Sequence, residues 1–146
     1  RLVGSEMCIR DRYLDVAGGA ASNGTNVQQW GASSSASYNT WKAVLVGNGY
    51  YQLYSQVGDG NTYLLDVADG NTSSGTNIRI WQNTFCDAQV FKLEQQSDGS
   101  YAILTKITNN QSGLDVESGS KSSGANVQQW GYAGGAHQKW IFEKVN

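Results

Sequence analysis

An acidic residue followed at a fixed distance by a tryptophan occurs three times in the chain. Each copy has the acidic residue in a Leu-Asp-Val triplet and the tryptophan 15 positions later. The pairs are Asp15 with Trp30, Asp66 with Trp81, and Asp115 with Trp130. An ionised carboxylate can accept hydrogen bonds from two neighbouring hydroxyl groups, and an indole can bury the apolar face of a sugar ring. The repeated pair therefore predicts one carbohydrate-binding position in each copy.

Each member of the pair also has an interpretation that needs no ligand. An Asp after a strand often bonds its own backbone in a turn, and a Trp often packs in a core. Residue alternation favours binding for the tryptophans, because Asn126, Gln128 and Trp130 fall on one strand face and Val127 on the other. We therefore expect the tryptophans of the three pairs to face outward. A second aromatic residue follows in each copy and is expected in the core: Trp41, Phe91 or Trp140.

A polar side chain two residues before each outward tryptophan extends the predicted site. Gln28 and Gln128 are placed to bond the aspartate or a sugar hydroxyl. Arg79 holds this position in the second copy. It either forms an ion pair with Asp66 and weakens the site or adds hydrogen-bond donors to it. The second site is therefore expected to be weakened or altered.

The composition excludes several other functions. The net charge of -2 gives no electrostatic support for a nucleic-acid or anionic-membrane partner, and no apolar run is long enough to span a membrane. The repeated carboxylates come one per copy and are expected on separate surfaces, whereas glycoside hydrolysis needs two at one bond. We predict no enzyme activity, no metal and no cofactor. Cys8 and Cys86 stand at unrelated positions of their copies and are predicted to be free thiols.

The copies recur about every fifty residues, since successive tryptophans of the pairs are 51 and 49 positions apart. This period indicates a repeat architecture, with boundaries near 1–48, 49–98 and 99–146 in one domain. Alternating segments and Gly-rich turns predict an all-β chain with four short strands per repeat. Closure into a barrel is favoured because it removes edge strands. Residues 1–12 do not resemble the other repeats, so they are either a remnant foreign to the domain or its first strand.

The second aromatic of each repeat closes a triplet related to Gln-x-Trp. The triplets are Asn39-Thr40-Trp41, Gln89-Val90-Phe91 and Gln138-Lys139-Trp140, of which only the third matches fully. With the Leu-Asp-Val triplets in register, residues 13–146 resemble the ricin B-type lectin domains, a β-trefoil family that includes the family-13 carbohydrate-binding modules. The resemblance implies a six-stranded barrel capped by three hairpins with pseudo-threefold symmetry. The positions that carry an intra-repeat disulfide in many members hold no Cys here.

The resemblance also implies the function and further site residues. Family members bind galactose-type or xylose/arabinose-type glycans, and many are attached to secreted glycoside hydrolases. A secreted, monomeric, non-catalytic module with up to three shallow sites is therefore expected. A domain that acts through protein contacts, as an inhibitor or toxin partner, is the alternative, followed by a small glycoside hydrolase.

Many members place an Asn just before the Gln-x-Trp triplet, where it reaches a sugar hydroxyl. His137 holds this position in the third repeat and Tyr38 in the first, where Asn39 is a candidate substitute. We expect the third site to be the best and the second the poorest. The predicted carbohydrate-binding residues are Asp115, Gln128, Trp130, His137, Gln138, Asp15, Gln28, Trp30, Asn39, Asp66, Trp81 and Arg79.

Overall fold

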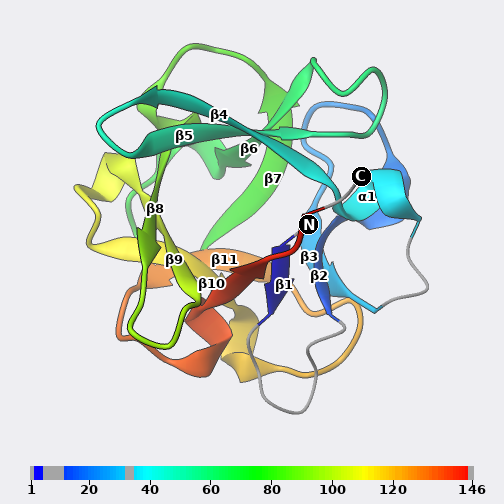
Figure 1. The fold of residues 1–146 in the computed structure, drawn as a ribbon. Coiled ribbons are helices and arrows are strands. Elements are labelled where there is room, and N and C mark those ends of the chain that lie inside the picture. Colours follow the sequence, from blue (N-terminus) through cyan, green and yellow to red (C-terminus); the bar gives the residue numbers. More distant parts are fainter. Residues whose placement is uncertain (1, 5–11, 32–34, 145–146) are drawn as a thin grey trace.

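The computed structural model describes residues 2–4, 12–31 and 35–144, which contain twelve strands in three groups of four. Figure 1 shows the three groups around a common centre, in sequence order from blue to red. The first repeat contains β1 (Leu2–Gly4), β2 (Tyr13–Val16), β3 (Val27–Trp30) and β4 (Trp41–Gly47). The second contains β5 (Tyr50–Ser55), β6 (Tyr63–Val67), β7 (Thr76–Gln82) and β8 (Phe91–Gln95). The third contains β9 (Tyr101–Thr105), β10 (Ser112–Val116), β11 (Val127–Gly131) and β12 (Trp140–Phe142).

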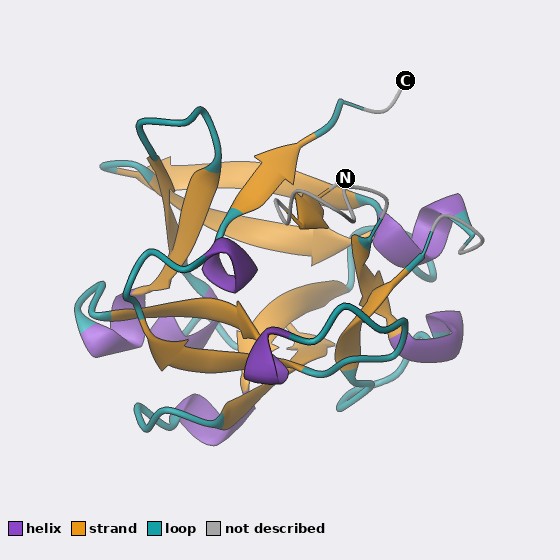
Figure 2. Ribbon diagram, turned by 90° about the horizontal axis from the view of Figure 1, so that it is seen from below, coloured by secondary structure: helices purple, strands orange, loops and turns teal. Residues whose placement is uncertain are grey.

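Short helical turns connect the strands and lie around the outside of the sheet (Figure 2). They are η1 (Ala17–Gly19), α1 (Ala36–Asn39), η2 (Ala68–Gly70), η3 (Asp87–Gln89), η4 (Lys106–Thr108), η5 (Glu117–Gly119) and η6 (Ala136–Gln138). One such turn follows each Leu-Asp-Val strand, and another precedes each strand that begins with the core aromatic. These turns bring the residues just before the core aromatics close to the Leu-Asp-Val strands.

Six strands pair antiparallel in the order β4–β5–β8–β9–β12–β1 and form the barrel. The remaining six form the hairpins β2–β3, β6–β7 and β10–β11. The core contains the second aromatic of each repeat with Leu and Val side chains of the Leu-Asp-Val triplets. A barrel capped by three hairpins is the β-trefoil that the repeats predict.

The barrel is least regular where the first repeat begins. Within the described ranges β4 pairs only with β5, whereas β8 and β12 each pair on both sides. Residues 42–46 of β4 are correspondingly exposed. Leu2–Gly4 does form a strand, paired with β12, as one of the two interpretations of residues 1–12 requires. Arg1 and residues 5–11 lie outside the described residues, and the foreign origin of the segment stays a prediction.

Three asparagines, one from each repeat, form a hydrogen-bonded ring where the hairpins meet. Asn26 Nδ2 donates to Asn126 Oδ1 at 2.9 Å, Asn126 donates to Asn77 at 2.9 Å, and Asn77 donates to Asn26 at 2.8 Å. Each side chain is partly buried. The ring therefore joins all three repeats through side chains that occupy equivalent positions.

We expect Asn26→Ala to lower the free energy of unfolding by about 1–3 kcal/mol, because it leaves one donor and one acceptor of the ring unpaired. The value is measured by urea denaturation. A second substitution, Asn126→Ala, should cost less in the Asn26→Ala background than alone, because its partner is already missing. Strictly additive costs would show that the ring does not act as a unit.

Across the described ranges, no helix has the length and apolar character needed to cross a membrane. No group of three or more His, Cys, Asp or Glu side chains forms a potential metal site in the same ranges. Cys86 is an exposed free thiol, as predicted. Cys8 lies outside the described residues.

Candidate functional site

The three aspartates sit at equivalent positions in the hairpins, each opposite the polar residue two positions before the tryptophan. The strand register pairs Asp15 with Gln28, Asp66 with Arg79, and Asp115 with Gln128. Residues directly opposite in an antiparallel pair project to the same face. Gln28 Nε2 donates to Asp15 Oδ1 and Gln128 Nε2 to Asp115 Oδ1, both at 3.1 Å. Each glutamine therefore holds one carboxylate oxygen of the aspartate in its own repeat.

Each repeat has a pocket lined by its aspartate, its polar partner and its outward tryptophan. The pocket of repeat one has a volume of about 360 Å³, and that of repeat three about 320 Å³. Repeat one adds Ala17, Gly18, Ser35 and Tyr38 to the lining, and repeat three adds Glu117, Ser118 and His137. The repeated aspartates come one per pocket, as predicted, but the pocket of repeat three contains a second carboxylate that does not belong to the repeated set. The turn after the strand brings Glu117 into the pocket beside Asp115.

The tryptophans of these pockets are exposed, and the second aromatics are buried. Trp30 is 37% exposed and Trp130 is 46% exposed, whereas Trp140 is 1% exposed. Trp140 Nε1 donates to the backbone oxygen of Leu114 at 3.3 Å, so its polar atom is satisfied inside the core. The outward orientation predicted from residue alternation is confirmed for Trp30 and Trp130, whereas Trp81 is half-buried, and the core position predicted for the second aromatics is confirmed.

In repeat three, three side chains surround the carboxylate of Asp115. Gln138 Nε2 donates to Asp115 Oδ2 at 2.9 Å, and His137 Nε2 lies 3.2 Å from the same oxygen. Gln138 is buried and also donates to the backbone oxygen of Gly131. Gln138 therefore positions Asp115 from beneath, while the half-exposed His137 lines the pocket.

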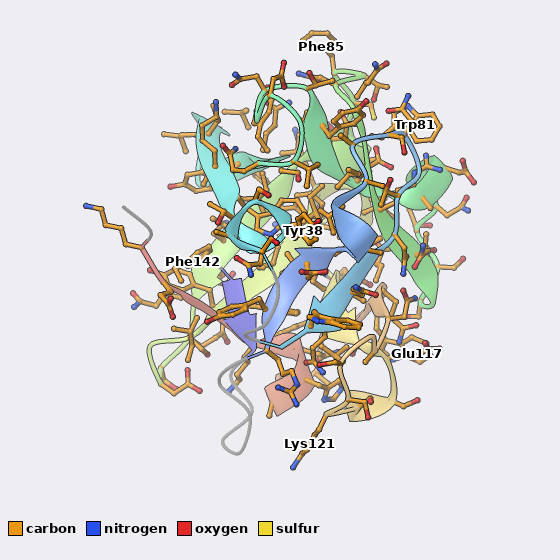
Figure 3. All side chains as sticks on the ribbon, turned by 90° about the vertical axis from the view of Figure 1, so that its right-hand side faces the viewer. Tyr38, Trp81, Phe85, Glu117, Lys121 and Phe142 are labelled. Atoms are coloured by element: carbon orange, nitrogen blue, oxygen red, sulfur yellow. The ribbon has the colours of Figure 1, made fainter. Side chains whose placement is uncertain are left out.

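Repeat one differs at the equivalent positions. Asn39 is wholly buried at the position of Gln138, and its amide has no hydrogen-bond partner among the described residues. The structure thus does not bring Asn39 to the pocket surface. Tyr38, projected from α1 and labelled in Figure 3, lines the pocket instead. Its ring lies so close to Gly19 that a Cβ atom there would clash with it.

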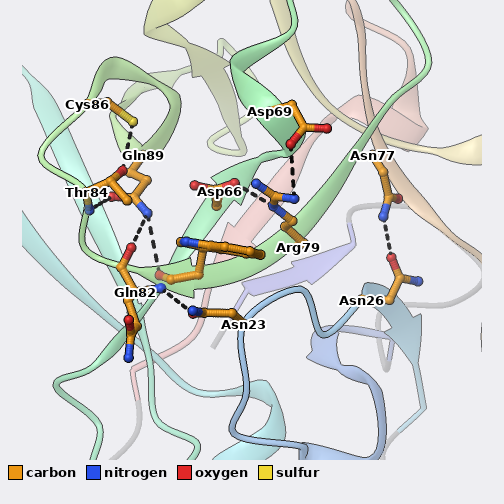
Figure 4. A network of polar contacts seen from close by, with 11 residues as sticks. Asn23, Asn26, Asp66, Asp69, Asn77, Arg79, Gln82, Thr84, Cys86 and Gln89 are labelled. Carbon is orange, nitrogen blue, oxygen red and sulfur yellow. Dashed lines mark hydrogen bonds and ion pairs between the residues drawn. The ribbon is translucent and has the colours of Figure 1, made fainter.

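In repeat two, Arg79 fills much of the corresponding space. Its Nε lies 2.9 Å from Asp66 Oδ1, and its Nη1 lies 3.6 Å from Asp69 Oδ1 (Figure 4). Its guanidinium carbon is also 4.2 Å from the centre of the Trp81 ring. Burial raises the pKa of Asp66 above its ordinary value by more than Arg79 lowers it. The pocket is smaller, about 190 Å³, and Ala88 replaces the His137 and Tyr38 side chains.

The ion pair in repeat two is one of the two outcomes predicted for Arg79. A cation over an indole face is a favourable contact and covers that face. Trp81 is accordingly less exposed than Trp30 and Trp130. Asp69, which the sequence argument did not include, is a second carboxylate in this pocket. Repeat two therefore holds its aspartate and its indole in contacts with its own arginine.

The arrangement can be compared with known proteins. A family model described as ricin-type beta-trefoil lectin domain-like matches residues 4–81, 41–130 and 87–146. The chain belongs to this family. No curated protein matches the chain significantly.

Solved structures show the same lectin-like fold. A designed threefold-symmetric protein, ThreeFoil, is 33% identical with a TM-score of 0.88, and the match covers 99% of this chain and 96% of that one. An exo-beta-1,3-galactanase of Clostridium thermocellum is 28% identical with a TM-score of 0.82, and the match covers 97% of this chain and 29% of the enzyme. A Macrolepiota procera ricin B-like lectin in complex with lactose is 18% identical with a TM-score of 0.74, over 97% of this chain and 91% of that one, and shows the fold alone.

A glycine of a neighbouring repeat lies close to the indole of each pocket in this lectin-like domain, with room beside the ring for no more than a Cβ atom. A Cβ atom at Gly124 would lie 3.5 Å from the Trp30 ring, and one at Gly75 would lie 3.7 Å from the Trp130 ring. Gly24 has the same relation to Trp81, at 3.6 Å. The sites are therefore assembled across repeat boundaries.

Two glutamines hold the supporting turns in place, and the sequence argument missed both. Gln29 Nε2 donates to the backbone oxygens of Ser120 and Ser122, each at 3.1 Å. Gln129 Nε2 makes the equivalent bonds to the turn at residues 71–73. Repeat two has the apolar Ile80 in this position, so the turn beneath Trp81 lacks such a bond. The sequence signal that could have found these glutamines is a polar residue on the core face of a strand.

We expect Arg79→Gln to open the pocket of repeat two, because it restores the Gln present in the other repeats and uncovers the Trp81 ring. The indole N–H signal of Trp81, followed by NMR during addition of a galactose-type oligosaccharide, should then shift, as we also expect for Trp30 and Trp130. The reciprocal change, Gln128→Arg, is the matched control and should weaken binding at repeat three by about tenfold, the equivalent of about 1.4 kcal/mol. If the Trp81 signal of the Arg79→Gln variant does not shift, the arginine is not what limits carbohydrate binding at this site.

Proposed function

We propose that this lectin-like domain is a non-catalytic carbohydrate-binding module with two similar sites, in repeats one and three. The single observation that carries the proposal is the pair of equivalent open pockets that join a fixed aspartate to an exposed indole. The aspartate and its glutamine offer acceptors and donors for vicinal hydroxyls. The indole offers an apolar surface for the ring that bears them.

Galactose-type glycans are the proposed ligands, with xylose/arabinose-type glycans as the other class to be tested. The similar domain of Clostridium thermocellum belongs to an exo-beta-1,3-galactanase, and the Macrolepiota procera lectin is in complex with lactose. The chain spans 29% of that galactanase. Attachment to a glycoside hydrolase, secretion and a monomeric state are parts of this proposal.

The proposed sites are shallow, which sets the expected affinity. A single open site should bind a monosaccharide with a dissociation constant near 1 mM, about -4 kcal/mol. Two sites on one rigid body can raise the affinity for a polysaccharide by about 100-fold or more through effective concentration. Strong preference for polymer over monosaccharide is therefore expected.

A glycan array with the domain tests the proposal, followed by calorimetric titration with galactan, arabinoxylan and the corresponding monosaccharides. Galactan binding that is much tighter than galactose binding is the expected result. Equal affinity for polymer and monosaccharide would contradict the two-site part of the proposal. Release of reducing sugar by the domain would contradict its non-catalytic character. Absence of binding to every glycan would leave protein contacts as the function.

A further inference from the structure

Phe85 is the most exposed large hydrophobic side chain among the residues that the structure describes, at 88%. It projects from the surface in Figure 3, in the loop between β7 and η3. Single exposed hydrophobic residues are common and need no special explanation. The backbone of Phe85 and its position beside a pocket make this one different.

The backbone at Phe85 is left-handed, with φ of 56°. A bulky residue is rarely found in this conformation because its Cβ atom crowds the backbone. The equivalent position in repeat three is Gly134, also left-handed with φ of 76°. Both residues come four positions after the outward tryptophan and six before the core aromatic. The same turn is thus built without strain by glycine in one repeat and with strain by phenylalanine in another.

Hydrogen bonds hold this strained turn on both sides of Phe85. Asn83 Oδ1 accepts from the backbone N–H of Phe85 at 2.9 Å, and Gln89 Oε1 accepts from that of Thr84 at 2.9 Å. Thr84 Oγ1 and Cys86 Sγ are 3.0 Å apart (Figure 4). A ring presented by an anchored turn loses little freedom on binding, which favours affinity. Strain at an exposed position that the surroundings maintain is a reason to look for function.

Phe85 belongs to the loop that lines the pocket of repeat two, although its own side chain is not part of the lining. Thr84 and Cys86, the neighbours of Phe85 in sequence, both line the pocket of repeat two. Arg79 lies over Trp81 in that pocket. In repeat two the indole is therefore covered by Arg79, and an exposed phenyl ring stands in the loop that contributes Thr84 and Cys86 to the pocket.

We propose that Phe85 is the stacking platform of repeat two and binds the apolar face of a pyranose in a bound polysaccharide. The inference rests on the proposed function and adds a third contact to it. The surroundings favour a sugar over a protein partner, because the exposed neighbours Thr84 and Asp87 and the half-buried Asn83 are polar. A lone ring among polar groups matches a sugar, which has one apolar face and hydroxyls at its edge. A protein contact of this size would need a surrounding apolar or tightly packed rim.

The variant Phe85→Gly tests the proposal without endangering the fold, because glycine removes the strain and copies Gly134. We expect its affinity for galactan to fall about three- to tenfold as one of three linked contacts is lost, while its midpoint of thermal unfolding stays the same or rises. Phe85→Trp, which keeps an aromatic face, should retain the affinity. Unchanged galactan affinity in Phe85→Gly would overturn the proposal.

A site-resolved measurement separates this inference from the proposed function. In the wild type, a galactose-type oligosaccharide should shift the indole signals of Trp30 and Trp130 and the backbone amide signals of Thr84 and Cys86. Shifts at the two indoles without shifts at Thr84 and Cys86 would refute the role of Phe85 but not the proposed function. No shift at any of the four would refute the proposed function itself. Self-association that disappears in Phe85→Gly, with glycan binding intact, would assign the ring to a protein contact and also overturn the proposal.

Discussion

The double variant Asp115→Ala, Trp130→Ala is expected to lose binding at repeat three by about 100-fold or more, equivalent to about 2.8 kcal/mol. In the proposed site, Asp115 would supply charge-assisted hydrogen bonds to hydroxyls and Trp130 the stacking surface, so the variant removes both kinds of contact. Because Trp130 is exposed, its removal should leave the fold intact. Calorimetry with galactan measures the loss of affinity, and the NMR signal of the Trp30 indole reports on the site of repeat one.

Repeat one provides the internal control for this variant. Its pocket has the same Asp, Gln and Trp, so the Trp30 signal should still respond to the oligosaccharide. Because only one of the two linked sites remains, the preference for polymer over monosaccharide should also fall. The matched variant Asp15→Ala, Trp30→Ala should show the converse pattern. Full affinity in the first variant would remove repeat three from the proposed binding surface.

The second large effect is on stability, and it concerns a tryptophan only ten residues further along the chain. We expect Trp140→Ala to lower the free energy of unfolding by about 3–5 kcal/mol, because a fully buried indole is replaced by a cavity. The backbone oxygen of Leu114 also loses its hydrogen-bond donor inside the core. Urea denaturation of the wild type and the variant measures the difference.

Trp130→Ala is the matched control for this second prediction. The two variants make the same chemical change, but Trp130 is 46% exposed and is not part of the hydrophobic core. Its cost should be below about 1 kcal/mol, and its effect should fall on binding. Similar losses of stability in the two variants would contradict the division into core and surface aromatics.

The sequence was sufficient to predict this division, because strand alternation and a threefold repeat are local properties. It was not sufficient for the details of each pocket, which depend on the turns. In repeat one, Asn39 aligns with Gln138 but is wholly buried, and Tyr38 lines the pocket instead. In repeat three, the one-turn helix after Val116 places Glu117 beside Asp115. Neither result follows from spacing alone.

Contacts between repeats were also beyond prediction from the sequence. Gln29 is a buried residue of β3, and its hydrogen-bond partners lie 91 and 93 residues away. The strain at Phe85 was equally hidden, because the backbone conformation at that position is a consequence of the loop that repeats two and three share. Residue type alone gives no warning that a Phe occupies a left-handed position.

The glycine support beneath each indole has a consequence for how such a protein can be divided. A single repeat of about fifty residues, made alone, would keep its aspartate but would leave the back of its indole in water. Binding would return only when the units close into a full circle, whether as one covalent chain or as three separate copies. Cutting the chain between repeats and rejoining its ends should therefore be tolerated, whereas deleting one repeat should abolish binding at every site, because the remaining two cannot close the circle.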